Sequence, residues 1–404
     1  MPGPLDGFKV IDLTTMVSGP LGTMILADQG ADVIKVETPN GGDHTRQVAT
    51  RRNGFSASFL NNNRNKRSIA LNLKTPEGLE AVKRLVRDAD VFIQNFRPGV
   101  IERLGLGYEV LRDLNPKLVY ASISGFGFEG PFAQKPVFDP LIQCLSGLTT
   151  VQAGADEERP RLVRTILPDK LTGFAMAQAV CAALLARSRT GEGQHIRLSM
   201  LDAVLSFLWG SDMGGHTFVG DEMEKETAQS FIDLIYETKD GFISVAVMRH
   251  KEWCGLARAA GRPEWLDDPR FQDSEGLDRH KHARLELTQE ALRERTAEDW
   301  IERLEAEGVP CAPVLTRREA IRHPQAAANG IVMENDHPVA GRLRQARPPA
   351  VFSATSPEHR FGAPPLGGHT REILAAAGYA AAEIEAMIEN GSAAESNPRN
   401  EDAA

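Results

Sequence analysis

Lys9-Val10-Ile11-Asp12-Leu13 and Asp32-Val33-Ile34-Lys35-Val36-Glu37 decide the fold, because each is a short, mainly apolar run of strand length. The segment between them, Pro20 to Gly30, has the composition of a helix and ends on a glycine, a common C-terminal signal. A strand, a helix and a second strand within roughly 30 residues form a βαβ unit. The sequence therefore predicts a parallel sheet that begins at the N-terminus.

The turn after the first strand differs from that of dinucleotide-binding βαβ units. Thr14-Thr15-Met16-Val17-Ser18-Gly19-Pro20 lacks the G-x-G-x-x-G pattern that lets a pyrophosphate approach the backbone, although Glu37 stands where such folds carry a ribose-binding acid. Gly125-Phe126-Gly127-Phe128-Glu129-Gly130 does fit the pattern, yet Pro131 follows it and the next helix is expected only near Asp139. A nicotinamide oxidoreductase is therefore the weakest functional hypothesis.

Strands and helices alternate through the first half of the chain. Apolar runs of strand length lie at 69–73, 90–94, 118–122 and 195–199, and helical patterns lie at 76–88, 100–104, 174–187 and 200–209. This alternation is typical of an α/β fold with a large, doubly wound, mainly parallel sheet covered on both faces.

The composition shifts toward charged residues from Asp221 onward, which indicates a linker and a second domain. We predict a large domain over residues 1–220 and a smaller α/β domain over residues 221–325. Residues 326–390 are expected to return to the large domain and complete it. The stretch 391–404 is small and polar and is expected to be a disordered tail.

Composition and charge exclude several classes of function. The 404 residues are 42% hydrophobic and 25% charged, as in ordinary globular proteins, and the net charge of −9 argues against nucleic-acid binding. The four cysteines lie far apart without a C-x-x-C pair, so we expect a reducing, cytoplasmic location and no metal site. The chain begins directly with a strand and lacks an 18-residue apolar run, so neither a signal peptide nor a membrane span is expected.

Leu167-Pro168-Asp169-Lys170-Leu171-Thr172-Gly173 joins an apolar run at 162–167, expected to be a strand, to an Ala-rich helix. The common local role of an acid at such a position is to cap the helix N-terminus. The alternative is a carboxylate held there for chemistry, because a helix N-terminus favours negative charge and presents free N–H groups. The two roles are compatible, and the local sequence leaves both open.

Several blocks of the sequence together resemble one family, the class III CoA transferases. The blocks run in family order over nearly the whole chain, at 10–13, 30–37, 65–74, 95–99, 193–199 and 366–374. The resemblance implies a large α/β domain made of N- and C-terminal segments, a smaller inserted domain, and two chains interlocked as a homodimer. It also implies coenzyme A or an acyl-CoA as substrate, with no tightly bound cofactor.

By the same resemblance Asp169 is the nucleophile, with Thr172 and Gly173 in the family's Asp-x-x-Thr/Ser-Gly context. The related racemases carry a His before an upstream Asp, where this chain has Phe138-Asp139. A phenylalanine cannot abstract the α-proton of an acyl-CoA, so an isomerase or racemase is disfavoured. A non-catalytic acyl-CoA-binding protein is the third alternative, and the intact acid argues against it.

The resemblance further implies a CoA-binding surface made of basic, apolar and amide side chains. Lys74 and Arg103 are the candidates for the phosphates, and Leu71 and Leu73 for an apolar bed under the adenine. The full set of implied CoA contacts is Ser18, Leu71, Asn72, Leu73, Lys74, Asn95, Phe96, Arg97, Arg103, Phe138 and Asp139.

Two departures from the formyl-CoA transferases bear on the acid substrates. Val17 stands where those enzymes carry a Gln, and between Met213 and Asp240 only Gly214-Gly215 and Gly220 replace their run of four glycines. The formate and oxalate pairing is therefore not carried over. We expect the acceptor to be a small carboxylic acid, a class that includes dicarboxylates.

A carboxylate suits the implied chemistry. With an ordinary pKa of about 3.9, an Asp is ionised at pH 7 and attacks a thioester without a separate base. Because a carboxylate is a weak nucleophile, positioning and oxyanion donors must contribute most of the rate. The expected course is an aspartyl anhydride with CoA thiolate, then an aspartyl-CoA thioester with free acid, then the reverse steps with a second acid.

Overall fold

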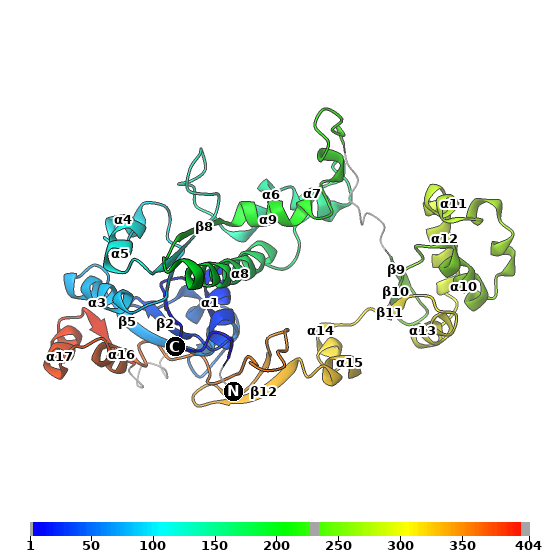
Figure 1. Cartoon of the computed structure of the whole chain (residues 1–404). Coiled ribbons are helices and arrows are strands. Elements are labelled where there is room, and N and C mark those ends of the chain that lie inside the picture. Colours follow the sequence, from blue (N-terminus) through cyan, green and yellow to red (C-terminus); the bar gives the residue numbers. More distant parts are fainter. Residues whose placement is uncertain (1–2, 226–233, 397–404) are drawn as a thin grey trace. The chain divides into compact units, whose positions relative to one another are not determined.

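The computed structural model describes residues 3–225 and 234–396, which divide into two compact units (Figure 1). The large unit comprises Met1–Gln229 and Ile331–Ala404, and the small unit comprises Ser230–Gly330. The sequence predicts a small unit inserted between two segments of a large one, over residues 221–325, whereas the observed unit begins at Ser230 and ends at Gly330.

A seven-stranded sheet forms the centre of the large unit. In spatial order its strands are β14 (Ala393–Ala394), β5 (Lys66–Leu71), β2 (Asp32–Glu37), β1 (Lys9–Asp12), β6 (Val91–Gln94), β7 (Val119–Ser124) and β8 (His195–Ser199). All neighbours pair in parallel except β14, which is antiparallel to β5. Without β14, the chain order of the strands is the doubly wound order, with the winding direction reversing between β1 and β6.

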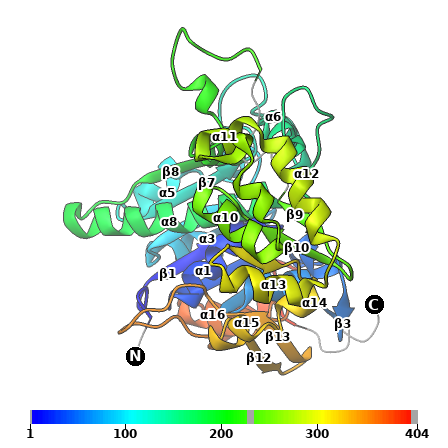
Figure 2. The same ribbon diagram turned by 90° about the vertical axis from the view of Figure 1, so that its right-hand side faces the viewer.

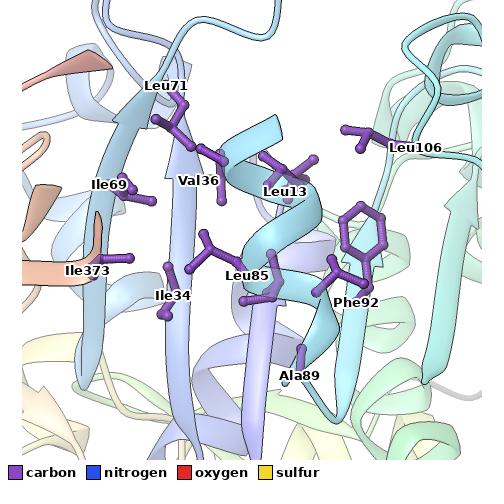
Figure 3. Packing of buried hydrophobic residues seen from close by; sticks show 14 of the residues in the cluster. Leu13, Ile34, Val36, Ile69, Leu71, Leu85, Ala89, Phe92, Leu106 and Ile373 are labelled. Carbon is purple, nitrogen blue, oxygen red and sulfur yellow. The ribbon is translucent and has the colours of Figure 1, made fainter. Parts of the chain in front are cut away.

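One face of the sheet is covered by α3 (Pro76–Arg87), α5 (Tyr108–Leu114), α16 (Thr370–Ala376) and α17 (Ala381–Glu389). Because successive side chains of a strand point to opposite faces, Ile34 and Val36 face this layer while Val33 faces the other. Figure 3 shows Leu85 of α3 lying against this face of the sheet. The apolar strands are therefore buried on both sides, as the sequence predicts for a doubly wound fold.

The opposite face is covered by α1 (Ser18–Asp28) and α8 (Leu167–Thr190), which lie side by side (Figure 1). Their close approach depends on two glycines. A Cβ on Gly22 would lie 2.8 Å from the backbone oxygen of Gly173, and a Cβ on Gly173 would lie 2.8 Å from that of Ser18. Side chains at either position would push the two helices apart.

The start of α8 corrects the local sequence interpretation. The helix begins at Leu167, its N-cap is Ile166, and no strand forms over 162–167. Asp169 is therefore not the N-cap but lies inside the first turn. By length and composition α8 is apolar enough to cross a membrane, although no such segment was expected from the sequence. Its inner face is buried against α1 and the sheet.

The C-terminal segment gives a second correction. The expectation of disorder over 391–404 is wrong for its first residues, because Ala393 and Ala394 pair with Leu71 and Ala70 of β5. Asn72 N–H also donates to the Ser392 backbone oxygen at 2.8 Å. Small side chains let this strand lie close to the edge of the sheet, where it satisfies backbone groups of β5. Residues 397–404 of the expected tail lie outside the described residues.

The other elements of the large unit surround the sheet. They are β3 (Arg51–Arg52), β4 (Phe55–Ser56), α2 (Ala57–Asn63), α4 (Val100–Arg103), α6 (Asp139–Leu145), α7 (Leu148–Ala153), α9 (Met200–Trp209), β12 (Val332–His337) and β13 (Gly341–Ala346), with short 3-10 turns at His44–Gln47 and Gly214–His216. The hairpin of β12 and β13 contacts α2, where the Gln345 side chain donates to the Leu60 backbone oxygen at 2.9 Å.

The small unit, whose helices are labelled α10 to α15 in Figure 2, has its own core around Trp253 and Trp300, both fully buried. Its antiparallel sheet contains β9 (Ile235–Glu237), β10 (Phe242–Val245) and β11 (Cys311–Pro313). Its helices are α10 (His250–Ala260), α11 (Ser274–Arg279), α12 (Lys281–Leu292), α13 (Ala297–Ala306), α14 (Arg317–Ala320) and α15 (Pro324–Ala328), with 3-10 turns at Pro263–Leu266 and Pro269–Phe271.

Candidate active site

Three groups of candidate residues follow the carboxyl ends of parallel strands. The segment that leads to Ser18 leaves the end of β1, the Asn72–Lys74 segment leaves β5, and the Asn95–Arg97 turn leaves β6. In doubly wound sheets, ligands bind outside the carboxyl ends of the strands where the winding direction reverses. Here that position lies between the segments that follow β1 and β6.

Asp169 lies in the first turn of α8, partly buried, and faces the start of α1. The hydroxyl and the backbone N–H of Ser18, the first residue of α1, are close enough to act on this carboxylate as donors, which lowers the pKa of Asp169. The close packing at Gly173 brings these two helix starts together. Thr172 is buried and donates to the Pro168 backbone oxygen at 2.7 Å, so it supports the turn rather than the carboxylate.

Asp139 is the second acid of the site. It is the first residue of α6 and only 4% exposed. Its Oδ2 accepts the backbone N–H of Asp169 at 3.2 Å, and its Oδ1 accepts from the Gln143 side chain at 2.6 Å. It therefore does not cap its own helix, which has Phe138 at the N-cap, but satisfies a free N–H of α8.

The surroundings of Asp169 raise its pKa to about 6. Burial is the larger cause, and the negative charge of Asp139 adds to it, while the hydrogen bonds from Ser18 act in the opposite direction. At pH 7 most of the Asp169 population is still ionised, although less completely than an ordinary aspartate. A partly desolvated carboxylate is a stronger nucleophile than a fully hydrated one, so this environment suits attack on an electrophilic carbonyl.

Phe138, the residue before Asp139, is exposed, with a relative accessibility of 68%. Leu141 and Leu145 of the same helix and Phe174 of α8 are also exposed apolar residues. The replacement of a histidine by Phe138 therefore leaves an apolar surface, and no titratable group, beside Asp139.

A pocket of about 680 Å³ lies at the end of β5, lined by Asn72, Lys74 and the segment of β14 among others. Lys74 is exposed and Asn72 half-buried there. Leu71 does not belong to this surface, because its side chain is fully buried in the core, so the predicted apolar bed is wrong for that residue. Leu73 is only partly buried and packs against the same core.

The turn after β6 contains three predicted residues in different situations. The side-chain amide of Asn95 makes two hydrogen bonds to the backbone of Thr15. Its oxygen accepts the N–H of Thr15 at 3.0 Å, and its NH2 group donates to the backbone oxygen of Thr15 at 2.8 Å. The N–H of Phe96 donates to the Gln94 side chain at 2.8 Å, and its ring packs against the core. Arg97 is exposed, as is Arg103 in α4.

A buried group of ion pairs beneath the start of α1 was missed by sequence reasoning. Asp12 pairs with Lys66 at 3.1 Å, and Lys35 pairs with Asp43 at 2.9 Å, with all four side chains fully buried. Burial disfavours the charge of Asp12, yet Lys66, Lys35 and two threonine hydroxyls lower its pKa to about 2. The signal in the sequence was the lysine in the middle of the apolar strand Asp32–Glu37.

The ribose-binding resemblance of Glu37 has a structural explanation. Its carboxylate accepts two hydrogen bonds from the Arg46 guanidinium, at 2.8 and 2.6 Å, and a third from Ser68. The polar block around Asn65 is likewise turned inward, because Arg64 and Asn65 both bond to the carboxylate of Asp28. The guanidinium groups of Arg46 and Arg64 are thus engaged in ion pairs within the fold, which makes them poor candidates for binding a phosphate.

Within residues 3–225 and 234–396 there is no group of three or more His, Cys, Asp or Glu side chains that could hold a metal ion. The four cysteines, all of which lie in this described part, are unpaired.

Comparison with known proteins gives one consistent result. The model of CoA-transferase family III matches residues 5–370. The chain is 32% identical to the human succinyl-CoA:glutarate CoA-transferase, covering 92% of this chain and 85% of the relative. It is 35% identical to the acetyl-CoA:oxalate CoA-transferase of Acetobacter aceti, covering 90% and 93%. The crystal structure of a CAIB/BAIF family protein from Brucella suis superposes with a TM-score of 0.82 at 32% identity, covering 93% of this chain and all of that one.

Proposed function

We propose a covalent mechanism for this chain, which belongs to CoA-transferase family III and is a CoA transferase. In this mechanism CoA moves from an acyl-CoA to a small carboxylic acid through an intermediate on Asp169. The observation that carries the proposal is a carboxylate with a raised pKa in the first turn of a helix, next to Ser18, on a residue whose backbone N–H donates to Asp139. An ionised but poorly solvated acid at this position is costly for stability and suited to nucleophilic attack.

The proposed reaction begins when an Asp169 carboxylate oxygen attacks the thioester carbonyl. The C–S bond breaks, CoA leaves as the thiolate, and a mixed anhydride of Asp169 with the donor acid remains. The thiolate then attacks the Asp169 carbonyl carbon, which releases the donor acid and leaves an aspartyl-CoA thioester. An acceptor carboxylate reverses both steps, so the acceptor departs as its CoA thioester and Asp169 is regenerated.

Helix N-termini supply the electrostatic stabilisation in this scheme. The first turns of α8 and α1 both carry backbone N–H groups without a partner in their own helix, and both turns lie beside Asp169. Asp139 occupies one of these donors, the N–H of Asp169 itself. Its negative charge raises the pKa of the nucleophile.

We further propose that the pocket beside Lys74 receives the phosphorylated end of CoA, with Arg97 and Arg103 as additional cationic groups. The exposure of these three side chains supports that role, because a cation already paired in the core contributes little to an anionic ligand. The acids that name the relatives, glutarate and oxalate, make a dicarboxylate the first acceptor to test.

A homodimer and a cytoplasmic location are part of the same proposal. The exposed apolar surface at Phe138, Leu141 and Phe174 supports a second copy as its cover, and the four unpaired cysteines agree with a reducing compartment. Light scattering at micromolar concentration tests the dimer, and a monomer at all concentrations would contradict it.

The covalent intermediate is tested by incubating the protein with acyl-CoA donors and hydroxylamine, followed by peptide mass analysis. Hydroxylamine converts an activated Asp169 to its hydroxamate, and Asp169→Ala should show no adduct. Absence of an adduct with every donor that supports transfer would refute the aspartyl intermediate. Deuterium exchange at the α-carbon without acid exchange would instead indicate an isomerase.

A further inference from the structure

We propose that Asn95 is a positioning residue of the acyl-transfer site: its side-chain amide fixes the segment Thr14–Val17, and this segment sets where Ser18 meets Asp169. The inference rests on the proposed role of Asp169. It also reassigns Asn95, which the sequence predicts to contact CoA, from the ligand to the geometry of the nucleophile.

The amide of Asn95 bridges the place where the winding of the sheet reverses. It lies just after β6, and it bonds to the backbone N–H and the backbone oxygen of Thr15, just after β1. Two bonds from one planar amide fix both the distance and the orientation of the segment. A ligand that used the same amide would have to compete with both bonds.

The neighbours of Thr15 are held as firmly, by side chains from other elements. The N–H and the hydroxyl of Thr14 both donate to the Asp12 carboxylate, and its backbone oxygen accepts from Lys35 at 2.7 Å. The N–H of Met16 donates to Asp43 at 3.2 Å. Three successive residues thus have their backbone groups bound by side chains that are far apart in the sequence.

The conformation imposed on Met16 shows that this binding is constraining. Met16 has φ of +70°, in the left-handed region that side chains other than glycine rarely adopt. Such a conformation persists only where the surroundings determine it, and it occurs often at functional sites. Val17 and the buried Ser18 follow directly, so a change in the segment is transmitted within two residues to the group that bonds Asp169.

Asn95 is the member of this set that a mutation can remove without exposing a buried charge. Its side chain is half-buried, whereas Asp12, Lys35 and Asp43 are fully buried and ion-paired. Asn95→Ala therefore releases Thr15 while the ion pairs beneath α1 remain. Because a misplacement of about 1 Å can reduce a rate by about 100-fold, we expect a fall in kcat of about 10- to 100-fold.

The experiment measures two quantities for Asn95→Ala: kcat in an acyl-transfer assay, and the dissociation constant for CoA by calorimetry. The expected result is the fall in kcat with a CoA dissociation constant within about twofold of the wild type, since only the positioning of the nucleophile is altered. The acid limb of the pH–rate profile should also move to higher pH, because weaker hydrogen bonds from Ser18 no longer oppose the effects of burial and Asp139 on Asp169.

The matched control is Asn62→Ala, the same substitution in α2, whose amide donates to the Ser58 oxygen of its own helix. It should leave both quantities unchanged. If Asn95→Ala instead raises the CoA dissociation constant and keeps kcat, Asn95 is a CoA ligand and the inference is overturned; unchanged values for both overturn it as well.

Two further measurements keep the result interpretable. Should Asn95→Ala melt below the assay temperature, Asn95→Asp, which keeps the shape and the acceptor for Thr15 N–H, is judged by the same criteria. Asp169→Ala separates the two proposals. If that variant still transfers CoA, the proposed nucleophile is wrong, whereas an inactive Asp169→Ala beside a fully active Asn95→Ala refutes the positioning role alone.

Discussion

Two aspartates near the start of α1 show how the same side chain serves opposite purposes. Asp12, at the end of β1, is fully buried, and its lysine and threonine partners lower its pKa to about 2. Asp169, in the first turn of α8, is less buried, yet its pKa is raised to about 6, because the negative charge of Asp139 adds to the larger effect of burial. Burial acts in the same direction on both acids. The compensating charges decide whether the carboxylate stabilises the fold or remains available for chemistry.

The largest expected effect is on activity at Asp169. Asp169→Asn keeps the shape but replaces the nucleophile by an amide, so transfer should fall by about 1,000-fold or more. The same variant should be more stable than the wild type by about 1–2 kcal/mol at pH 7, since an ionised acid with a raised pKa is removed. Steady-state transfer assays and urea unfolding measure the two effects. A variant that is inactive and also less stable would contradict the contrast with Asp12.

Asp12→Asn is expected to give the reverse pattern, because its main effect should be a loss of stability. Loss of the carboxylate leaves Lys66 and Lys35 short of a counter-charge in the core, which typically costs about 3–5 kcal/mol. Urea unfolding at pH 7 measures this loss, with the exposed Asp6→Asn as control. An Asp12→Asn protein of unchanged stability would show that the ion pairs beneath α1 contribute little.

The pH dependence of the two acids should differ in sign. The raised pKa of Asp169 means that the folded protein holds a proton between about pH 3.8 and 6 that the unfolded chain has released, so this group lowers stability as pH rises through that window. The lowered pKa of Asp12 gives stability that is present above pH 3.8 and lost as pH falls to about 2. In catalysis kcat/KM should rise with pH to a plateau, with an apparent pKa of about 6. A flat profile from pH 5 to pH 8 would refute the raised pKa.

Asp139→Asn tests the cause of the raised pKa. The amide oxygen can still accept the N–H of Asp169, but the negative charge is gone, so the acid limb should move to lower pH by a fraction of a unit to about one unit. The pH–rate profile of this variant measures the shift. An acid limb at the wild-type position would assign the whole effect to burial.

The smallest effect is expected from Met16→Gly. Glycine adopts the φ of Met16 without strain but loses more entropy on folding, so stability should change by less than about 1 kcal/mol. Transfer activity should stay within a few-fold of wild type, because Asn95 and Asp43 still hold the segment. Met16→Val is the contrasting variant, since a β-branched residue in this conformation is costly. The melting temperatures of Met16→Gly and Met16→Val, each compared with the wild type, measure the two changes in stability.

Local sequence patterns predicted the bounds of an element correctly where the residues of that element determine its structure. The bounds of β2 at Asp32–Glu37 and of α9 at Met200–Trp209 agree with the prediction, because strand-like and helix-like patterns there have clear ends. The start of α8 was misassigned because Leu162–Leu167 is as apolar as a strand. In the structure this segment is mostly exposed and irregular, and the N–H of Val163 donates to the Gln143 side chain at 2.9 Å.

Contacts between segments that are far apart in the chain could not be predicted from the sequence. The pairs Lys66–Asp12 and Arg64–Asp28 join segments far apart in the chain, so from sequence alone these basic residues are indistinguishable from exposed ones. For the candidate site, Asp169 was identified by resemblance, whereas its environment depends on Ser18 and Asp139, which only the folded arrangement brings to it. The burial of Leu71 and the amide bridge of Asn95 are likewise properties of the assembled sheet.

The edge of the sheet at β5 has a consequence for how the protein is made. Its outer neighbour is β14, and the nearby His369 and Thr370 also bond to β5, so its partners are translated about 300 residues later, after the whole small unit. Until then, the strand Lys66–Leu71 presents an unpaired, partly apolar edge, which is a template for aggregation. A chaperone that covers this edge until the C-terminal segment has been translated should therefore raise the yield of folded protein.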